Sequence, residues 1–209
     1  MSQQFSSAPS SDIQSLFNST LDDYEKRTGI NLVDHQLTIN LNSCGTADSI
    51  ISAIRNHIQT LNNFRVEDGA PVIKWLKRIV RHLSTLSTNG VLGREGTLLF
   101  PLENAILAAF GVLLSAIDDT QVSTNYEMLI DLFRSVESFL KRLTTCIKIP
   151  PTTAASKVVV KLLLELLSTL ALAIQQVKEG SLGGSLSFSV RYSSSGTYRE
   201  VGRKAFRRK

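Results

Sequence analysis

The chain has 209 residues, of which 43% are hydrophobic and 20% are charged, with 12 glycines and 5 prolines. This composition excludes a mostly disordered, collagen-like or linker-like chain and leaves enough apolar side chains for one sizeable core. The 2 cysteines are too few for a disulfide scaffold, and the first residues lack the basic start and apolar run of a secretory signal, so a cytoplasmic protein is expected.

The net charge of +5 belongs to the carboxyl end of the chain. Residues 191–209 contain seven basic side chains and one acidic side chain, whereas the other 190 residues carry 16 basic and 17 acidic ones, a net charge of −1. Residues 180–202 are rich in glycine and serine and have no helical periodicity. We therefore divide the chain into a disordered N-terminus (1–10), a helical domain (11–182) and a Gly/Ser-rich basic tail (183–209).

Apolar residues recur at helical spacing in six segments. The first segment is predicted to form a helix from a capping box at Ser11 to Gly29, because glycine suits a helix end. The second is predicted to begin at an N-cap formed by Thr46 or Asp48 and to reach Phe64.

The segment 31–44, between these two helices, is ambiguous. Its run 36–42 alternates between polar and apolar residues as a strand does. A lone strand would have no partner in this chain, so we expect a short helix or a packed loop.

Four more helices follow. One spans 71–86 and begins at a proline, whose missing N–H costs nothing at the first helical position. The next, 102–117, is apolar nearly all round and should be central. The last two are predicted from a capping box at 124 to 143, and from 152 to about 179.

The predicted fold class is all-α, a multi-helix up-and-down bundle of about six helices with a flexible basic C-terminal tail. Short connections after several helices favour antiparallel neighbours. The longest nearly apolar runs, 105–117 and 162–174, are each about 20 Å long as helices, which is shorter than a hydrocarbon core of about 30 Å.

No motif for reaction chemistry is found in the sequence. The glycine-rich segment 90–97 precedes a helix, but it lacks the lysine of a phosphate-binding loop and places Glu95 beside the phosphates. The histidines have no Cys, Asp or Glu at ligand spacing, and Cys44 and Cys146 are expected to be small buried apolar residues. We therefore predict no catalytic, metal-binding or cofactor-binding residue and no enzymatic activity.

One helix carries a candidate contact surface for anions. Lys74, Lys77, Arg78 and Arg81 stand at positions i, i+3, i+4 and i+7, on one helix face, with Trp75 at its border. Such a face attracts anionic lipid head groups. The alternatives are a solvated surface and a docking edge for acidic side chains of the same bundle.

The basic tail is a second candidate contact for anions, binding phosphates of lipid or nucleic acid. No RNA-recognition motif or helix-turn-helix supports nucleic-acid binding, and a terminus without a dedicated ligand is the alternative. The tail residues concerned are Arg199, Arg203, Lys204, Arg207, Arg208 and Lys209.

Four sequence blocks occur in the order typical of one known family. The blocks are FRVEDGAPVIKWLKRIVRHLSTLS, LFPLENAILAAFGVLLSAIDD, YEMLIDLFRSVESFLKRL and IPPTTAASKVVVKLLLELLSTLALAIQQVKEG. Together they resemble the fungal STAND N-terminal Goodbye domain over approximately Ser15 to Leu182. After Leu182 the chain departs from the family, because Gly183, Gly184 and a serine-rich tail replace the lysine- and leucine-rich turns that lead to the next domain.

The resemblance implies an all-helical N-terminal module of fungal NOD-like receptor proteins, normally followed by a nucleotide-binding NACHT domain and a repeat sensor. It implies a signalling or effector role in nonself recognition and regulated cell death, a relation to helical bundles that permeabilise membranes, and no catalytic residues.

Our working hypothesis is a noncatalytic signalling or effector domain that acts by self-association or membrane engagement. Its expected partners are proteins, copies of itself or an anionic membrane surface, with no small-molecule substrate. The expected location is cytoplasmic, and peripheral at a membrane on activation. The alternatives are a protein-binding adaptor without membrane activity and nonspecific nucleic-acid binding by the tail.

Overall fold

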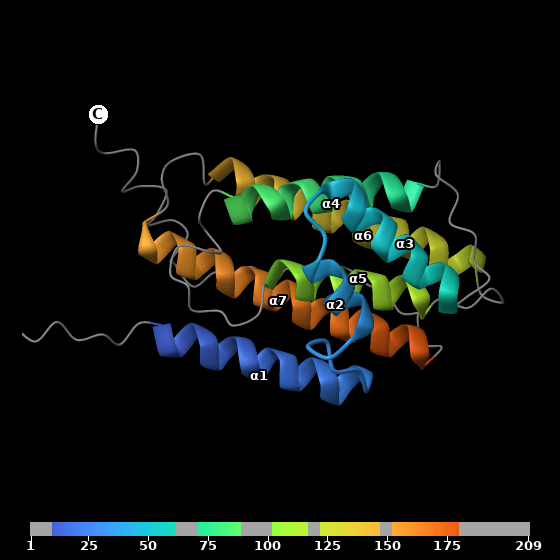
Figure 1. The fold of residues 1–209 in the computed structure, drawn as a ribbon, viewed down its shortest axis with the longest axis horizontal. Helices are drawn as coiled ribbons and strands as arrows, with labels where there is room; N and C mark the ends of the chain where they lie inside the picture. Colours follow the sequence, from blue (N-terminus) through green and yellow to red (C-terminus); the bar gives the residue numbers. More distant parts are fainter. Residues whose placement is uncertain (1–9, 62–70, 89–101, 117–121, 147–151, 180–209) are drawn as a thin grey trace, which may run out of the picture.

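The computed structural model describes residues 10–61, 71–88, 102–116, 122–146 and 152–179. Within these ranges the chain forms seven α-helices and no β-strand, which confirms the predicted all-α class (Figure 1). The helices are α1 (Ser10–Thr28), α2 (Gln36–Asn42), α3 (Ala47–Leu61), α4 (Pro71–Thr88), α5 (Leu102–Ser115), α6 (Val122–Cys146) and α7 (Thr153–Lys178).

The observed helix boundaries lie within a few residues of the predicted ones. The largest change at a helix start is in α6, which begins at Val122, two residues before the predicted start at Thr124. Residues 1–9, the predicted helix end at Phe64, the glycine-rich segment 90–97 and the tail 183–209 lie outside the described residues, so the predictions made for them stay predictions.

Local hydrogen bonds explain where two helices begin and end. At the start of α3 the Ser49 N–H donates to Thr46 Oγ1 at 3.2 Å and the Thr46 N–H donates to Ser49 Oγ at 3.1 Å. This reciprocal pair makes Thr46 the N-cap rather than Asp48. Gly29 ends α1 with φ of +70°, a conformation that favours glycine, and its N–H donates to the Glu25 carbonyl at 2.7 Å.

The ambiguous segment forms the short helix α2. Its N-cap is His35, whose Nδ1 accepts a hydrogen bond from the Leu37 N–H at 3.3 Å. Leu37 and Leu41 lie four residues apart and are both buried. A helical face therefore accounts for the burial of this segment, although its alternation also suited a strand.

The long helices run in two opposite directions, α4 and α6 one way and α1, α3, α5 and α7 the other, and parallel helices pack together in two layers, α4 with α6 and α1 with α7 (Figure 1). Figure 1 shows that the chain reverses direction at each connection from α3 to α7, which is the predicted up-and-down course. The most extensive contacts join α4 to α6 and α1 to α7, which run parallel and are not consecutive. In α4 and α6, Trp75 lies near Arg134 and His82 lies near Thr144, as parallel helices require.

Only one pair of consecutive long helices, α3 and α4, has the extensive antiparallel packing that short connections predict. In an up-and-down chain each helix runs parallel to the next helix but one, as α4 does to α6. Layers of parallel helices therefore bring such helices together.

Helix α5 is central, as its composition predicts. All its side chains from Ala105 to Leu114 are buried, and it contacts α2, α3, α4 and α7. Phe110 of α5 packs on Phe133 of α6, with ring centroids 4.9 Å apart. At Gly111 an added Cβ would overlap the Leu37 side chain, so this glycine permits the close approach of α2.

Helix α7 is long and apolar enough to cross a membrane by length and composition over Ala154–Lys178. That segment is longer than the apolar run 162–174 recognised in the sequence. More than half of its most apolar stretch is buried, and the helix packs against α1 and α5.

A lysine at the end of α7 anchors the end of α1. Lys178 Nζ donates to the Thr28 carbonyl oxygen at 2.7 Å, where the carboxyl end of a helix attracts cations. Lys178→Ala is expected to lower the free energy of unfolding by about 1 kcal/mol in urea titrations. Lys161→Ala, at an exposed position of the same helix, is the matched control. An equal loss in the two variants would contradict a specific role for this contact.

Candidate functional site

Helix α4 divides into an apolar face and a basic face. Its apolar side is set by aliphatic residues at helical spacing, all of them buried: Val72, Ile73, Leu76, Ile79, Val80, Leu83 and Leu86. On the other side Lys74, Lys77 and Arg81 are exposed, and none of them forms an ion pair with any residue in the described part of the chain. Docking to acidic side chains of the same bundle, one of the alternatives to anion binding, is therefore not seen for these three cations within the described residues.

The fourth predicted cation, Arg78, is half-buried against Trp75. Its Cζ lies 4.8 Å from the Trp75 ring centroid, and Cζ of Arg134 on α6 lies 5.9 Å from the same ring. Arg134 also pairs with Asp131, with Nη1 and Oδ1 2.9 Å apart. A half-buried indole close to two guanidinium groups thus joins the surfaces of α4 and α6.

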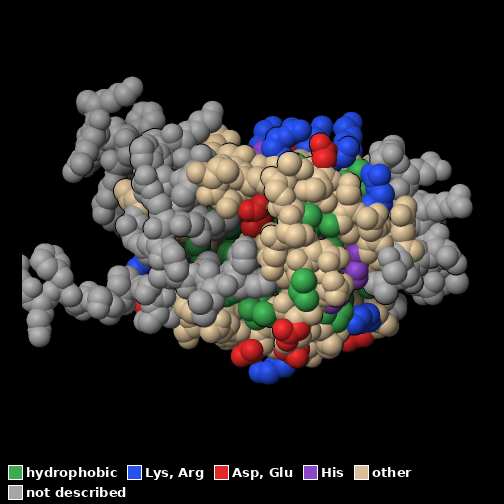
Figure 2. Space-filling model, viewed as in Figure 1, with side chains coloured by type: hydrophobic (Ala, Val, Ile, Leu, Met, Phe, Trp, Pro, Cys, Tyr) green, Lys and Arg blue, Asp and Glu red, His purple; other side chains and the backbone are tan. Residues whose placement is uncertain are grey.

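We call this set of side chains the α4 basic surface. Figure 2 shows Lys and Arg side chains gathered along the upper edge of the molecule, where Figure 1 places α4. Its members are Lys74, Trp75, Lys77, Arg78, Arg81 and Arg134.

The structure adds Arg134 to the residues predicted from sequence. Arg134 lies 59 positions from Trp75 along the chain, and no spacing rule reaches that far. The six tail residues predicted as anion contacts, from Arg199 to Lys209, lie outside the described residues.

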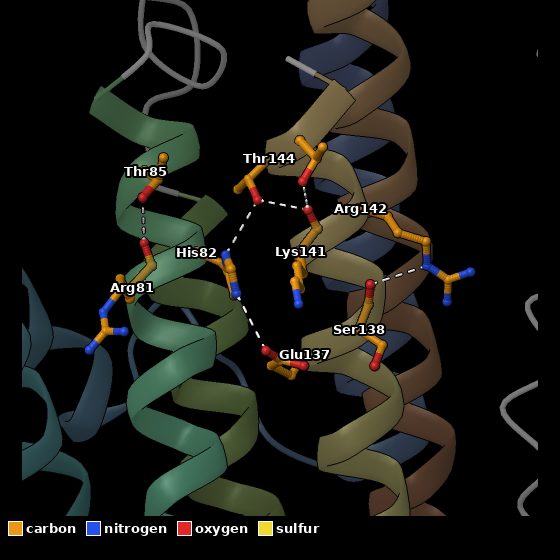
Figure 3. A network of polar contacts seen from close by, with 9 residues as sticks. Arg81, His82, Thr85, Glu137, Ser138, Lys141, Arg142 and Thr144 are labelled. Atoms are coloured by element: carbon orange, nitrogen blue, oxygen red, sulfur yellow. Dashed lines mark hydrogen bonds and ion pairs between the residues drawn. The ribbon is translucent and has the colours of Figure 1, made fainter. Parts of the chain in front are cut away.

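A polar network fastens α4 to α6 beside this surface (Figure 3). His82 Nε2 lies 3.6 Å from Glu137 Oε1, and His82 Nδ1 lies 3.3 Å from Thr144 Oγ1. The i,i+4 spacing predicts that Glu137 pairs with Lys141. That prediction is wrong, because the carboxylate faces His82 of α4 instead.

A hydroxyl, an imidazole and a carboxylate in a row suggest a hydrolase triad, but the setting of this row is unsuited to one. The Thr144 hydroxyl donates to the Lys141 carbonyl of its own helix at 2.9 Å. Backbone N–H groups inside a helix are already bonded and cannot form an oxyanion hole. We therefore assign the network a structural role, holding α4 and α6 in register.

The two cysteines differ in exposure. Cys44 is half-buried, and its Sγ lies 3.4 Å from the Asn40 carbonyl oxygen. Cys146 is exposed, so the prediction that it is a buried apolar residue is wrong. The reason is its place at the last residue of α6, beyond the buried stripe of that helix.

A pair of histidines lies where α2 meets α3. The rings of His35 and His57 contact edge to face, with centroids 5.0 Å apart. Burial lowers the pKa of His35, and burial followed by the nearby His35 lowers the pKa of His57. The folded state therefore disfavours protonation of both rings.

The histidine pair predicts a pH dependence of stability. A histidine with a lowered pKa binds fewer protons in the folded state than in the unfolded chain. Its contribution to the free energy of unfolding is therefore present above about pH 6.5 and is lost as the pH falls below that value. The free energy of unfolding is thus expected to fall between pH 7 and pH 5. His35→Asn keeps an N-cap acceptor and removes one titrating group, so its urea-unfolding curve should change less with pH. An unchanged pH slope in this variant would contradict the assignment.

Comparison with known proteins gives one match. A family model described as the fungal STAND N-terminal Goodbye domain matches residues 17–145, which is more than half of the chain and includes all of α4 and the part of α6 that carries Arg134. No curated protein matches the chain. No solved structure matches it either.

Proposed function

This chain belongs to the family of fungal STAND N-terminal Goodbye domains, and we propose that it acts as a noncatalytic effector module that engages an anionic membrane surface through the α4 basic surface. Membership of the family supports a signalling or effector role in general. Membrane engagement, self-association and a part in nonself recognition or regulated cell death are the finer parts of this proposal.

The observation that carries the proposal is the group of exposed cations on α4. Lys74, Lys77 and Arg81 have no acidic partner among the described residues, so no described carboxylate competes with an external anion for them. Each basic side chain near an anionic bilayer contributes about 1 kcal/mol. Trp75 adds an indole at the border of the face, and indoles favour the level of the lipid head groups.

Helices α5 and α7 supply the apolar surface that a later step would use. Helix α5 is buried along its length, and α7 is long enough to cross a bilayer but is covered by α1 and α5. We propose that adsorption through α4 brings these helices to the membrane, where opening of the bundle would expose apolar surface for insertion or self-association.

Vesicle flotation with the full chain tests adsorption. The protein is expected to float with vesicles that contain phosphatidylglycerol and to stay behind with pure phosphatidylcholine vesicles. Raising the salt from about 0.1 M to about 0.5 M should release it, because the Debye length shrinks. Equal recovery with both vesicle types would contradict adsorption through charge.

Dye release from the same vesicles separates an effector from an adaptor. An effector that opens on the membrane releases dye, whereas an adaptor forms defined complexes with proteins and releases none. The nucleic-acid alternative rests on residues 199–209, outside the described residues, and predicts binding that is lost when that segment is deleted.

A further inference from the structure

A pocket of about 540 Å³ lies where the carboxyl end of α4, the amino end of α5 and the junction of α2 with α3 meet. That volume falls within the range of about 300–1,000 Å³ that is usual for small-molecule sites. The pocket is independent of the α4 basic surface except for Arg81, which belongs to both.

Opposite charges line this pocket without neutralising each other. Arg81 of α4 and Glu103 of α5 both contribute to its wall, yet no ion pair within 4.0 Å joins them. Glu103 is held in place by Ser84, whose Oγ donates to Glu103 Oε1 at 3.0 Å. Two residues of opposite charge that are not paired with each other therefore line the same space, and the carboxylate of one is held by a hydroxyl group.

The rest of the lining suits a polar molecule with a short carbon chain. Next to Arg81, α4 contributes Thr85 and Thr88, whose hydroxyl groups donate to backbone carbonyl oxygens of α4 and keep only their oxygens as acceptors. Beside Glu103, Asn104 Nδ2 donates to Asn42 Oδ1 at 2.7 Å, which fastens α5 to the end of α2. Apolar side chains complete the lining: Leu41 and Ile50.

We propose that this pocket binds a zwitterion in which a short carbon chain joins a phosphate to a primary ammonium. The guanidinium of Arg81 would hold the phosphate, since its N–H groups donate several hydrogen bonds to phosphate oxygens. The Glu103 carboxylate would hold the ammonium, and Leu41 and Ile50 would contact the carbon chain. Adsorption to an anionic surface needs only negative charge, so this inference goes beyond the proposed function.

Glycerophosphoethanolamine is the probe, titrated into the full chain and followed by calorimetry or amide NMR shifts. Saturable binding to the wild-type chain is expected. Arg81→Gln and Glu103→Gln should each weaken it at least about tenfold, as loss of one charged contact does. Glu103→Gln keeps an acceptor oxygen for Ser84, so this variant should remain folded. Arg142→Gln, an exposed cation of α6 that points away from α4 in Figure 3, is the matched control and should bind as the wild type does.

Two results would overturn the proposal. One is that inorganic phosphate or ethanolamine alone binds as tightly as glycerophosphoethanolamine. The pocket would then not recognise both charges of the ligand. The other is no saturable binding, or an equal loss in Arg142→Gln.

Binding to vesicles then shows whether the ligand of this pocket is a lipid headgroup or a free metabolite. A loss of binding to phosphatidylethanolamine vesicles in Glu103→Gln assigns the site to a lipid headgroup, and unchanged vesicle binding with weakened binding of the soluble probe assigns it to a free metabolite. Adsorption through the α4 basic surface is measured separately on phosphatidylglycerol vesicles, which carry no ammonium, so the two proposals fail independently.

Discussion

Replacing Lys74, Lys77 and Arg81 together by glutamine is expected to weaken binding to phosphatidylglycerol vesicles about 100-fold, because each basic side chain near such a surface contributes about 1 kcal/mol. All three side chains are exposed on one face of α4, so the bundle should keep its stability. Arg78 is left unchanged because it packs on Trp75. Binding is measured by flotation over a range of lipid concentrations.

The chain provides a control with the same change of net charge. Lys26, Arg142 and Lys161 are also exposed, and they lie on α1, α6 and α7. Replacing these three by glutamine removes three positive charges away from α4. Vesicle binding should then weaken by much less than with the α4 variant. A similar loss in both variants would show that net charge, and not the α4 basic surface, governs adsorption.

Phe133→Ala is expected to lower the free energy of unfolding by about 3–5 kcal/mol, as truncation of a buried aromatic residue usually does. Phe133 is fully buried and packs on Phe110, with ring centroids 4.9 Å apart, at the point where the layer of α4 and α6 meets the central helix α5. The loss is measured by guanidinium unfolding followed by circular dichroism.

An exposed apolar residue serves as the control for this truncation. Ile39 of α2 is 51% exposed, and Ile39→Ala should cost less than about 1 kcal/mol because little buried area is removed. In a double-mutant cycle, Phe110→Ala and Phe133→Ala should not be additive, since the two rings share one contact. Additive losses would contradict direct packing between the two layers.

Much of the secondary structure could be predicted because its causes are local. Helical spacing of apolar residues located α4 in the chain, and the nearly all-apolar sequence of α5 identified the central helix. The cations of α4 followed from spacing alone. At α3 the sequence left two N-caps open, and the Thr46 hydrogen bonds with Ser49 decided between them.

The packing of the layers depends on contacts between distant parts of the chain. No rule of spacing places Arg134 beside Trp75, or turns Glu137 towards His82 rather than Lys141. The pocket of Arg81 and Glu103 was missed for the same reason, because three separate segments form its wall. Sequence periodicity identifies which face of a helix is buried, but it does not identify the neighbour that covers it.

We propose the α4 basic surface as the face that meets an anionic membrane, and Trp75 reports on that face directly because it is the only tryptophan in the chain. The measurement is its fluorescence when the protein is bound to phosphatidylglycerol vesicles whose acyl chains carry bromine near the head group. We expect the emission to shift to shorter wavelength, to be quenched by the bromines and to become protected from iodide. Emission that is unchanged and fully accessible to iodide, while the protein floats with the vesicles, would contradict the claim.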